Sequence, residues 1–429
     1  MNRSGSFRPR RSLMGGPVTE EPDPFAVWRR AAAAPPPGAI LYVHIPFCRS
    51  RCSFCPFYRG GADEREWKAY VVLLEEELRR TAPFFAGTSI NSVYFGGGTP
   101  GDLTPEAMTR LLRAVKSSYR LANDCEITLE SRIDGLDGER IAAAVENGVN
   151  RFSLGVQTFD TRLRRSLGRS SDRETVLELI ARLTSRDQAS VAADILYGLP
   201  GQTPEMLLRD LDTVVRATAL SGISFYRLRL HDRLPLAEKI RQGAVPALPD
   251  DERCFELFSL GEERMRAAGA KRISFKHFSL HPRERDLHNE LAAWKVSCLP
   301  FGIGAGGRLG KWRFRQAEDL ALYRNLTEAG EKPLAGAGRL PDDHETGGRI
   351  AGQLNCRMVC DPVFSAAAAP EALREKVRKN LEDALAGLTE KGFFHAPQFG
   401  VSRLTRRGRF QCGTVAGELM ECAARAWEK

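Results

Sequence analysis

The chain has 429 residues, of which 42% are hydrophobic and 27% are charged, a composition typical of a soluble globular protein with one large domain and a smaller one. The formal net charge is +9, but four arginines lie within the first sixteen residues without an acidic residue among them, so the rest of the chain carries about +5 (9 − 4), an excess that suits an acidic small molecule at least as well as nucleic acid. No apolar run approaches the roughly 18 residues needed to span a bilayer, and the N-terminus lacks the apolar core of a secretory signal, so we expect a cytoplasmic protein without a membrane partner.

The N-terminal segment 1–37 is expected to be a flexible arm. It is rich in arginine and ends in "AAAAPPPG". A helix that begins at "PFAVWRR" could continue through the alanines, but the prolines would stop it.

From about residue 38, apolar segments alternate with amphipathic helical stretches such as 64–81 and 105–120. The six segments expected to be strands are 39–45, 90–95, 125–130, 151–156, 191–198 and 222–230. Repeated strand–helix units predict a parallel sheet with right-handed crossovers. The expected fold is therefore α/β, with a partial (β/α)6 TIM-like barrel over 38–310 and a further strand at 272–278 beside or below the sheet.

After about residue 310 the alternation ends, and a smaller, mostly helical domain is expected over 311–429. Its segment 381–410 predicts a helix followed by a small hairpin, as in a winged helix. The stretch "LTRRGRF" within it could contact phosphates, but the interleaved aromatic and basic residues of an RNA-binding surface are sparse. We therefore expect no nucleic-acid partner.

Three cysteines, Cys48, Cys52 and Cys55, lie within eight residues just after the first predicted strand. Without a secretion signal, thiols at this density indicate a metal site rather than disulfides. Three thiolates on one loop can bind three irons of a [4Fe–4S] cluster and leave the fourth iron open to another ligand. His44 is expected to be a hydrogen-bonding partner on the strand rather than a metal ligand.

The other seven cysteines are scattered among apolar or helical contexts, and most are expected to be small buried hydrophobes. Cys356 and Cys360 are four residues apart on a possible helix. They could form half of a metal site, but no partner pair is evident.

The spacing of the three cysteines resembles the cluster motif of the radical S-adenosylmethionine (SAM) superfamily. The neighbouring motifs "LYVHIPFC", "YFGGGTP", "EITLE", "SLGVQTF", "LGR" and "ILYGLPGQT" resemble the branch of oxygen-independent coproporphyrinogen III oxidase, over about residues 39–310. The resemblance implies a [4Fe–4S] cluster on Cys48, Cys52 and Cys55. It also implies SAM on the open iron, one or two SAM molecules in all, and one-electron cleavage of SAM to a 5′-deoxyadenosyl radical.

The resemblance further implies a set of residues around the cluster and SAM, each near the carboxyl end of a strand. They are Tyr42, Phe54, Gly96, Gly97, Gly98, Thr99, Pro100, Glu130, Gln157, Arg169 and Asp194. Glu130, the candidate catalytic residue, would contact the SAM amine or a second SAM. Arg169 would face a carboxylate and Asp194 a ribose or amine. Taken singly, Glu130 and Asp194 could be solvated strand ends and Arg169 an exposed helix cap.

Three kinds of protein in this branch compete: the oxidases, the haem chaperones and the anaerobic haem-degrading methyltransferases. The oxidases carry a further cysteine two residues after the third, where this chain has Phe57. The chaperones end the barrel with "HNxxYW", which "HNELAAW" (288–294) only partly matches. The segments "CPFYRG" and "CLPFGIGAGGRLG" are most similar to the methyltransferases, although "YRG" departs from the aromatic-Gln-Asn of that group.

The resemblance therefore implies a radical SAM C-methyltransferase that methylates and opens haem, releases iron and a linear tetrapyrrole, and takes electrons from a donor such as a flavodoxin. Arginines near the barrel mouth would attract the haem propionates. The candidates are Arg227, Arg229 and Arg308, although any one of them, taken singly, is more often an ordinary surface arginine. The haem iron would bind a His or Met. The candidates are His277, His281 and His288, which could instead be structural.

Overall fold

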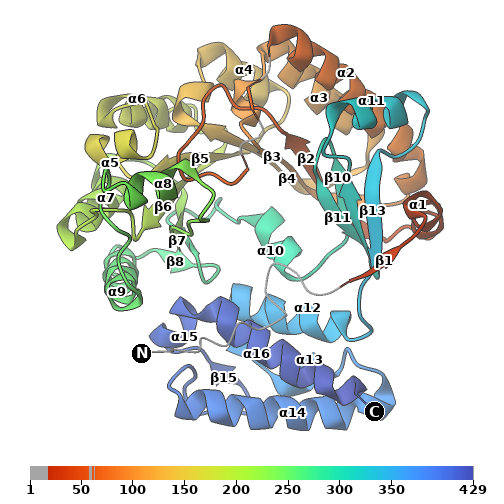
Figure 1. Cartoon of the computed structure of the whole chain (residues 1–429), viewed down its shortest axis with the longest axis vertical. Coiled ribbons are helices and arrows are strands. Elements are labelled where there is room, and N and C mark those ends of the chain that lie inside the picture. Colours follow the sequence, from red (N-terminus) through yellow and green to blue (C-terminus); the bar gives the residue numbers. More distant parts are fainter. Residues whose placement is uncertain (1–17, 58–59, 62, 429) are drawn as a thin grey trace.

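The computed structural model of the chain describes residues 18–57, 60–61 and 63–428. Six parallel strands form its centre and confirm the six segments expected from the sequence. They are β2 (Gly38–Ile45), β3 (Ser89–Gly97), β4 (Leu121–Arg132), β5 (Arg151–Gln157), β6 (Ser190–Tyr197) and β7 (Gly222–Arg227). The strands curve into an open barrel, and helices cover the outer face (Figure 1).

The helices between these strands begin where the sequence provides caps. Asp63 and Glu66 form a capping box at the start of α2, so this helix begins where expected. Prolines occupy the first turn of α3 and α7, where their missing N–H costs nothing. The helices between these strands are α2 (Glu64–Thr81), α3 (Pro105–Ser118), α4 (Gly138–Glu146), α5 (Thr161–Ser166), α6 (Arg173–Thr184) and α7 (Pro204–Ala217). After β7 come α8 (Pro235–Arg241) and α9 (Asp251–Ala267).

The two faces of the sheet differ in chemistry because successive side chains of a strand point to opposite faces. Along β4, Ile127 and Leu129 belong to the large hydrophobic core. Glu126, Thr128 and Glu130 alternate with them, and the carboxyl groups of Glu126 and Glu130 are buried. The inner face of the barrel is therefore polar, although it is shielded from water.

The sheet continues beyond residue 310, so the expected domain boundary there is wrong. After α10 (Leu287–Ala293), β10 (Cys298–Phe301) lies parallel to β2. The next strands extend that edge in antiparallel pairs, with α11 (Leu320–Glu328) between the last two. They are β11 (Gly306–Leu309), β12 (Trp312–Gln316) and β13 (Leu334–Arg339). Residue 310 lies in the turn between β11 and β12, and the helical region begins only after β13.

The N-terminal arm is also more ordered than expected, at least over the described residues. β1 (Thr19–Glu21) pairs with β13 at the edge of the sheet. α1 (Pro24–Ala32) buries Trp28, whose ring lies 5.1 Å from that of Phe314 on β12. The flexible arm predicted over 1–37 is therefore wrong for this part, and its first seventeen residues lie outside the described residues.

At the other edge, the single strand expected over 272–278 is two short strands. β8 (Lys271–Arg272) pairs with β9 (His277–Ser279), and β9 pairs antiparallel with β7. A turn separates them, closed by the bond from the His277 N–H to the Ser274 carbonyl.

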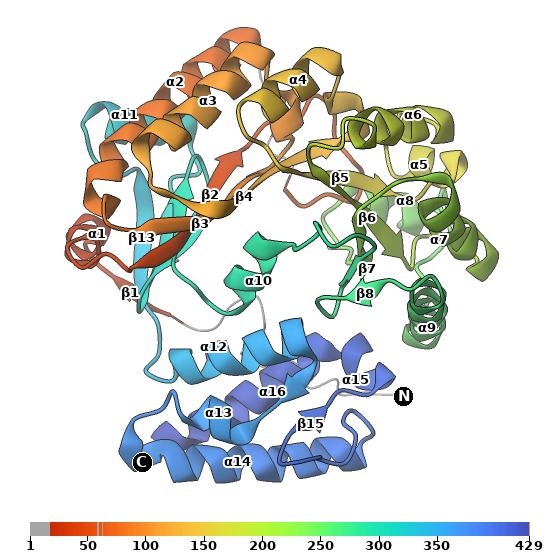
Figure 2. The same cartoon turned by 180° about the vertical axis from the view of Figure 1, so that it is seen from behind.

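The C-terminal domain has a hydrophobic core of its own and lies across the open side of the barrel, with α10 between them (Figures 1 and 2). The predicted helix and hairpin are present as α14 (Glu371–Glu390) and the antiparallel bridges Phe394–Leu404 and Gln398–Val401. The elements of the C-terminal domain are α12 (His344–Gly352), a π-helix η4 (Gln353–Arg357), β14 (Val359–Cys360), α13 (Pro362–Ala366), α14 (Glu371–Glu390), β15 (Ser402–Arg403), α15 (Arg406–Phe410) and α16 (Cys412–Ala424). Among the described helices, none is both long and apolar enough to cross a membrane.

Candidate active site

The three clustered cysteines lie on the loop that follows β2, here called the cluster loop (Cys48–Cys55). Cys48 and Cys52 are buried and Cys55 is half-buried. The Cys48 Sγ lies 3.2 Å from the Thr99 Oγ1. Burial raises the pKa of Cys48 to about 11, so this thiol ionises readily only when a metal binds it. All ten cysteines lie in the described ranges and are free thiols.

The cluster loop is fixed by two neighbouring segments. The backbone N–H of Ser53 donates to the Leu167 carbonyl at 3.0 Å, and the Ser53 carbonyl accepts from the Leu236 N–H at 2.9 Å. Gly168 has φ +79°, and a Cβ there would lie 3.2 Å from the Arg51 carbonyl oxygen. The "LGR" segment therefore packs directly against the loop that would bind the iron.

The glycine turn at the end of β3 lies against the same loop. A Cβ on Gly98 would lie 2.3 Å from the Phe47 carbonyl oxygen, and one on Gly97, which has φ +113°, would lie 2.5 Å from the His44 ring. Glycine is required at both positions for the ends of β2 and β3 to meet. The backbone N–H of Gly97 donates to Glu130 Oε2 at 3.3 Å, which connects the turn to β4.

Four residues predicted to contact SAM lie near the carboxyl ends of β4, β5 and β6, and we call them the mouth cluster: Glu130, Gln157, Arg169 and Asp194. Burial raises the pKa of Glu130 to about 7, and the nearby Asp194 carboxylate adds to this effect. Burial also raises the pKa of Asp194, although it accepts a hydrogen bond from the Tyr226 hydroxyl at 3.0 Å. A proton can therefore reside on Glu130 near neutral pH.

Gln157 and Arg169 carry buried polar atoms that have no hydrogen-bond partner in the described chain. These atoms are Gln157 Oε1, Arg169 Nε and Arg169 Nη1. Gln157 also has φ 72°, a strained conformation for a residue other than glycine. The Arg169 guanidinium lies 5.8 Å from the centre of the Phe54 ring, which brings Phe54 into the same site.

These unpaired atoms test whether the residues fit a SAM molecule. An unsatisfied buried polar group is costly, so an acceptor and two donors pointing into one site indicate a polar ligand. The carboxylate and hydroxyl groups of SAM supply the complementary atoms. Three thiols on a loop, with a glycine turn beside them, likewise fit a [4Fe–4S] cluster with one open iron.

Tyr42 lies deeper in the barrel than the cysteines. Its hydroxyl lies 3.0 Å from His44 Nδ1, which confirms a hydrogen-bonding partner for His44. The Tyr42 ring stacks on Tyr94 at 6.3 Å, and His288 from α10 lies 4.9 Å from Tyr94. Tyr94 and Tyr226 were missed in the sequence, although their inward positions on predicted strands give the signal that identifies them.

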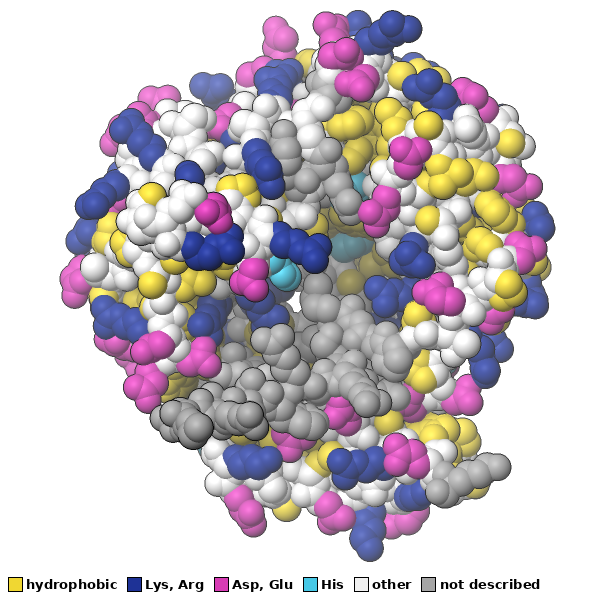
Figure 3. Space-filling view, in the orientation of Figure 1, with side chains coloured by type: hydrophobic (Ala, Val, Ile, Leu, Met, Phe, Trp, Pro, Cys, Tyr) yellow, Lys and Arg dark blue, Asp and Glu magenta, His cyan; other side chains and the backbone are white. Residues whose placement is uncertain are grey.

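The arginines predicted to attract haem propionates do not all lie at the mouth. Arg227 ends β7 but pairs with Asp251 at 2.6 Å, and Arg229 is exposed. Arg308 on β11 lies opposite Cys298 on β10 in the strand register, and Cys298 lies opposite Ile40 near the start of β2. Arg308 therefore lies at the far end of the barrel, because the antiparallel β11 reverses the chain, and its predicted role is wrong. Figure 3 shows Lys and Arg side chains around a hollow in one face of the molecule.

The three candidate histidines also separate. His281 is exposed and accepts from the Arg283 backbone N–H at 3.2 Å. His288 is buried beside Ser92, 3.2 Å from its hydroxyl, and burial lowers its pKa to about 4, so it is neutral. His277 is fully buried in an ion-pair network. The structural reading is therefore supported for His277, and the three do not form one haem-ligating group.

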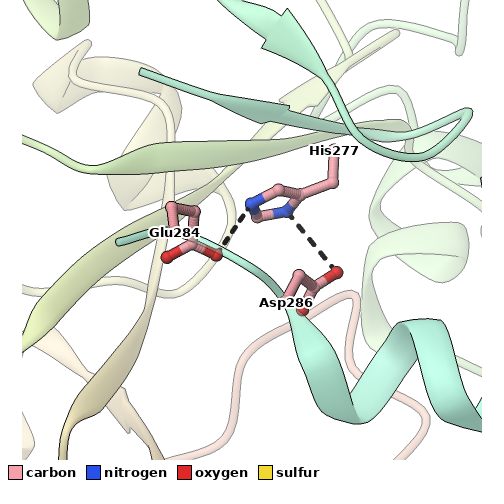
Figure 4. Close-up of side chains that lie close together, drawn as sticks. All are labelled: His277, Glu284 and Asp286. Carbon is pink, nitrogen blue, oxygen red and sulfur yellow. Dashed lines mark ion pairs between the residues drawn. The ribbon is translucent and has the colours of Figure 1, made fainter. Parts of the chain in front are cut away.

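His277, Arg151, Glu284 and Asp286 form a second buried polar group, here called the floor cluster. Figure 4 shows His277 between the two carboxylates, at 3.0 Å from Glu284 and 3.7 Å from Asp286. Three such side chains could hold a cation, but Arg151 already lies 2.8 Å from Glu284 and 3.2 Å from Asp286. Because this guanidinium supplies the positive charge, we assign the cluster a structural role.

Two weaker expectations fail to gain support. Cys356 lies on η4 and Cys360 on β14, with Met358 in a left-handed conformation between them, so they do not share a helical turn. In "LTRRGRF", Arg406 and Arg409 pair with Glu262 on α9, Arg409 through two bonds of 2.8 Å. These arginines hold the C-terminal domain to the barrel.

Comparison with known proteins agrees with this geometry. The Radical SAM superfamily matches residues 42–214. Anaerobilin synthase of Escherichia coli O157:H7 is 34% identical over 335 residues, covering 76% of this chain and 75% of that protein. Heme chaperone HemW of Bacillus subtilis is 26% identical over 385 residues, covering 88% and 98%. The structure of coproporphyrinogen III oxidase (HemN) from Escherichia coli covers 95% of this chain and 94% of that chain, with a TM-score of 0.81 at 22% identity, a likeness that shows the fold.

Proposed function

The chain belongs to the radical SAM superfamily, in the branch of oxygen-independent coproporphyrinogen III oxidase, with a [4Fe–4S] cluster and SAM as cofactors, and we propose that it methylates haem and opens the ring without oxygen. The products would be free iron and a linear tetrapyrrole. The reaction would serve iron acquisition in the cytoplasm, with electrons from a donor such as a flavodoxin.

The observation that carries the proposal is the similarity to anaerobilin synthase over three quarters of both chains. The environment of the cluster loop supports it. Phe57 lies two residues after Cys55, at the position where the oxidases have a further cysteine. It is 63% exposed. An exposed aromatic ring beside the cluster offers an apolar surface to a flat porphyrin.

Cys48, Cys52 and Cys55 would hold the cluster, which with SAM supplies carbon-centred radical chemistry by one-electron cleavage. The residues of the mouth cluster would orient SAM for that cleavage. Arg169 and Gln157 would bind its carboxylate and a hydroxyl through atoms that have no partner in the described chain. Ionised Glu130, already bonded to the Gly97 N–H, would accept from the amine, and Asp194 would accept from the ribose.

The two propionates of haem are negatively charged, so the chain must also provide positive charge. It must exclude water as well, because the radical intermediate is reactive. Arg229 is exposed just after β7, where a propionate could reach it. The C-terminal domain covers the open side of the barrel (Figure 2) and would limit solvent access to a reactive carbon radical.

A haem chaperone is the second candidate, because Heme chaperone HemW matches over 98% of its own length. His288, Asn289 and Trp294 partly match the chaperone segment "HNxxYW". A chaperone would bind haem and deliver it intact. The oxidase alternative would act on an iron-free porphyrinogen and release carbon dioxide from propionates.

The deciding experiment incubates the reconstituted protein anaerobically with haem, methyl-labelled SAM and a strong reductant. We expect the Soret band to decline, iron to reach a chelator and a linear tetrapyrrole to carry the methyl label. The variant Cys48→Ala is the control and should leave the haem unchanged.

Other outcomes would decide for the alternatives. Haem recovered intact, with only slow cleavage of SAM, would favour the chaperone. Release of carbon dioxide from coproporphyrinogen in a parallel tube would favour the oxidase despite Phe57.

A further inference from the structure

Two buried residues of opposite charge bond to the backbone of the cluster loop between Cys48 and Cys52. The Arg49 N–H donates to Asp102 Oδ2 at 3.1 Å. The Ser50 carbonyl accepts from Arg132 Nη1 at 2.7 Å. A carboxylate therefore satisfies the donor and a guanidinium the acceptor. Each residue is only 7% exposed.

The turns that carry these two residues interlock. Asp102 ends the short helix η2 (Pro100–Asp102), and Arg132 ends β4. A Cβ on Gly101 would lie 2.0 Å from the Ser131 hydroxyl oxygen, and one on Gly135 would lie 2.9 Å from Asp102 Oδ1. Neither turn can shift without the other, so the two charges are held at fixed positions beside the loop.

Further contacts determine how much of each charge remains uncompensated. Arg132 donates to Asp134 Oδ2 at 3.0 Å through Nη2, while its buried Nε has no hydrogen-bond partner in the described chain. Asp102 has the Arg49 guanidinium 3.8 Å away, but that side chain is 56% exposed and therefore screened by water. The two opposite charges are therefore held against the backbone of Arg49 and Ser50, the two residues directly after Cys48.

We propose that Asp102 and Arg132 are positioning residues that clamp the cluster loop, and that their opposite charges shift the reduction potential of the bound cluster in opposite directions. Reduction adds one electron from the reductant to the cluster. A nearby cation stabilises the added negative charge and raises the potential, whereas a nearby anion lowers it. Because both residues are buried, solvent screens these effects only weakly.

The test compares the reconstituted wild-type protein with Arg132→Gln, Arg132→Lys and Asp102→Asn. Iron content is measured first. The potential is then determined at pH 8 by dithionite titration with redox mediators, followed by electron paramagnetic resonance. We expect Arg132→Gln to lower the potential and Asp102→Asn to raise it. Each change should be about tenfold in the one-electron equilibrium constant, which is about 59 mV. Arg132→Lys keeps the charge and should stay close to wild type.

The opposite signs separate an electrostatic role from a merely structural one. A loosened loop would change solvent access in the same direction in both neutral variants, so shifts of one sign, or no shift in either, would overturn the proposal. If Arg132→Gln cannot bind a full cluster, Arg132→Lys decides. Full iron content with lysine supports the charged clamp, and loss with lysine as well overturns it. Arg110→Gln, on the outer face of α3, is the matched control and should leave the potential unchanged.

Discussion

The floor cluster and the mouth cluster occupy the same barrel and differ in how completely their charges are paired. In the floor cluster, Arg151 faces Glu284 and Asp286, and His277 lies between the same two carboxylates. Two of its nitrogens, Arg151 Nη1 and His277 Nε2, lack hydrogen-bond geometry, yet His277 Nε2 is still 3.0 Å from a carboxylate oxygen.

In the mouth cluster, by contrast, Arg169 forms no ion pair with any described residue, and Gln157 has an acceptor without a donor. The difference distinguishes buried polar groups that stabilise the fold from those that bind a ligand. Where the chain supplies the counter-charge, the group stabilises the fold. Where the chain leaves buried atoms unmatched, it accepts a cost that a ligand can repay.

The largest expected effect is loss of the iron–sulfur cluster from the cluster loop without damage to the floor cluster. Replacing Cys48, Cys52 and Cys55 together by alanine should remove about four irons per chain. The fold should remain, because the floor cluster and the core are untouched, and far-ultraviolet circular dichroism checks this. Full iron content in the triple variant would disprove the assignment of these cysteines as the cluster ligands.

Breaking the floor cluster should instead destabilise the fold. Arg151→Met removes the guanidinium that pairs with Glu284 and Asp286, and should cost about 3–5 kcal/mol in the free energy of unfolding. Denaturant titration measures this cost. The control Arg110→Met removes a half-exposed ion pair with Glu75 and should cost less than about 1 kcal/mol. Equal effects in the two variants would contradict the structural role of the floor.

Arg169→Met should have the reverse pattern. Without SAM, the variant should be no less stable than the wild type, because it removes two unpaired buried donors. SAM binding should weaken by about 10- to 100-fold, the loss of a charged hydrogen bond of about 1.5–3 kcal/mol. Calorimetry on the reconstituted protein gives the affinity. Unchanged SAM affinity together with a large loss of stability would place Arg169 with the floor residues.

The smallest effect is a pH dependence of SAM binding. The pKa of Glu130 is raised to about 7 by burial and by Asp194, so the carboxyl is ionised above pH 7 and protonated below it. Because only the ionised form attracts the SAM amine, affinity should fall as the pH drops below 7, by up to about tenfold per unit. Glu130→Gln should flatten the profile, and an equally steep profile in that variant would assign the dependence to another group.

Much of the barrel could be predicted because its signals are local. Most central strands are short apolar segments, and the start of α2 follows from the capping box at Asp63 and Glu66. The strands β12 and β13 were missed because "WRFRQ" is rich in arginine and "LAGAGR" contains two glycines. Their pairing with neighbouring strands forms them, and a local pattern does not record such pairing.

The site divides in the same way. Cysteine spacing predicted the cluster loop, because its three thiols are close in sequence. The mouth cluster was implied by the family resemblance that the strand-end motifs carry. The role of Arg132 depends on Ser50, 82 residues earlier, so no local pattern could reveal it. The sequence favoured a structural role for His277 over a haem-ligand role, and the carboxylates around it support the structural role.

The pairing of β1 with β13 has a practical consequence for anyone who shortens the chain for expression. Trimming at residue 37, where the arm was expected to end, would remove β1 and expose the open edge of β13, a glycine-rich strand with few side chains to block another edge. It would also uncover the surface of Phe314 that Trp28 buries. Such a product would be prone to edge-to-edge aggregation, whereas a chain that begins before Thr19 keeps the edge covered.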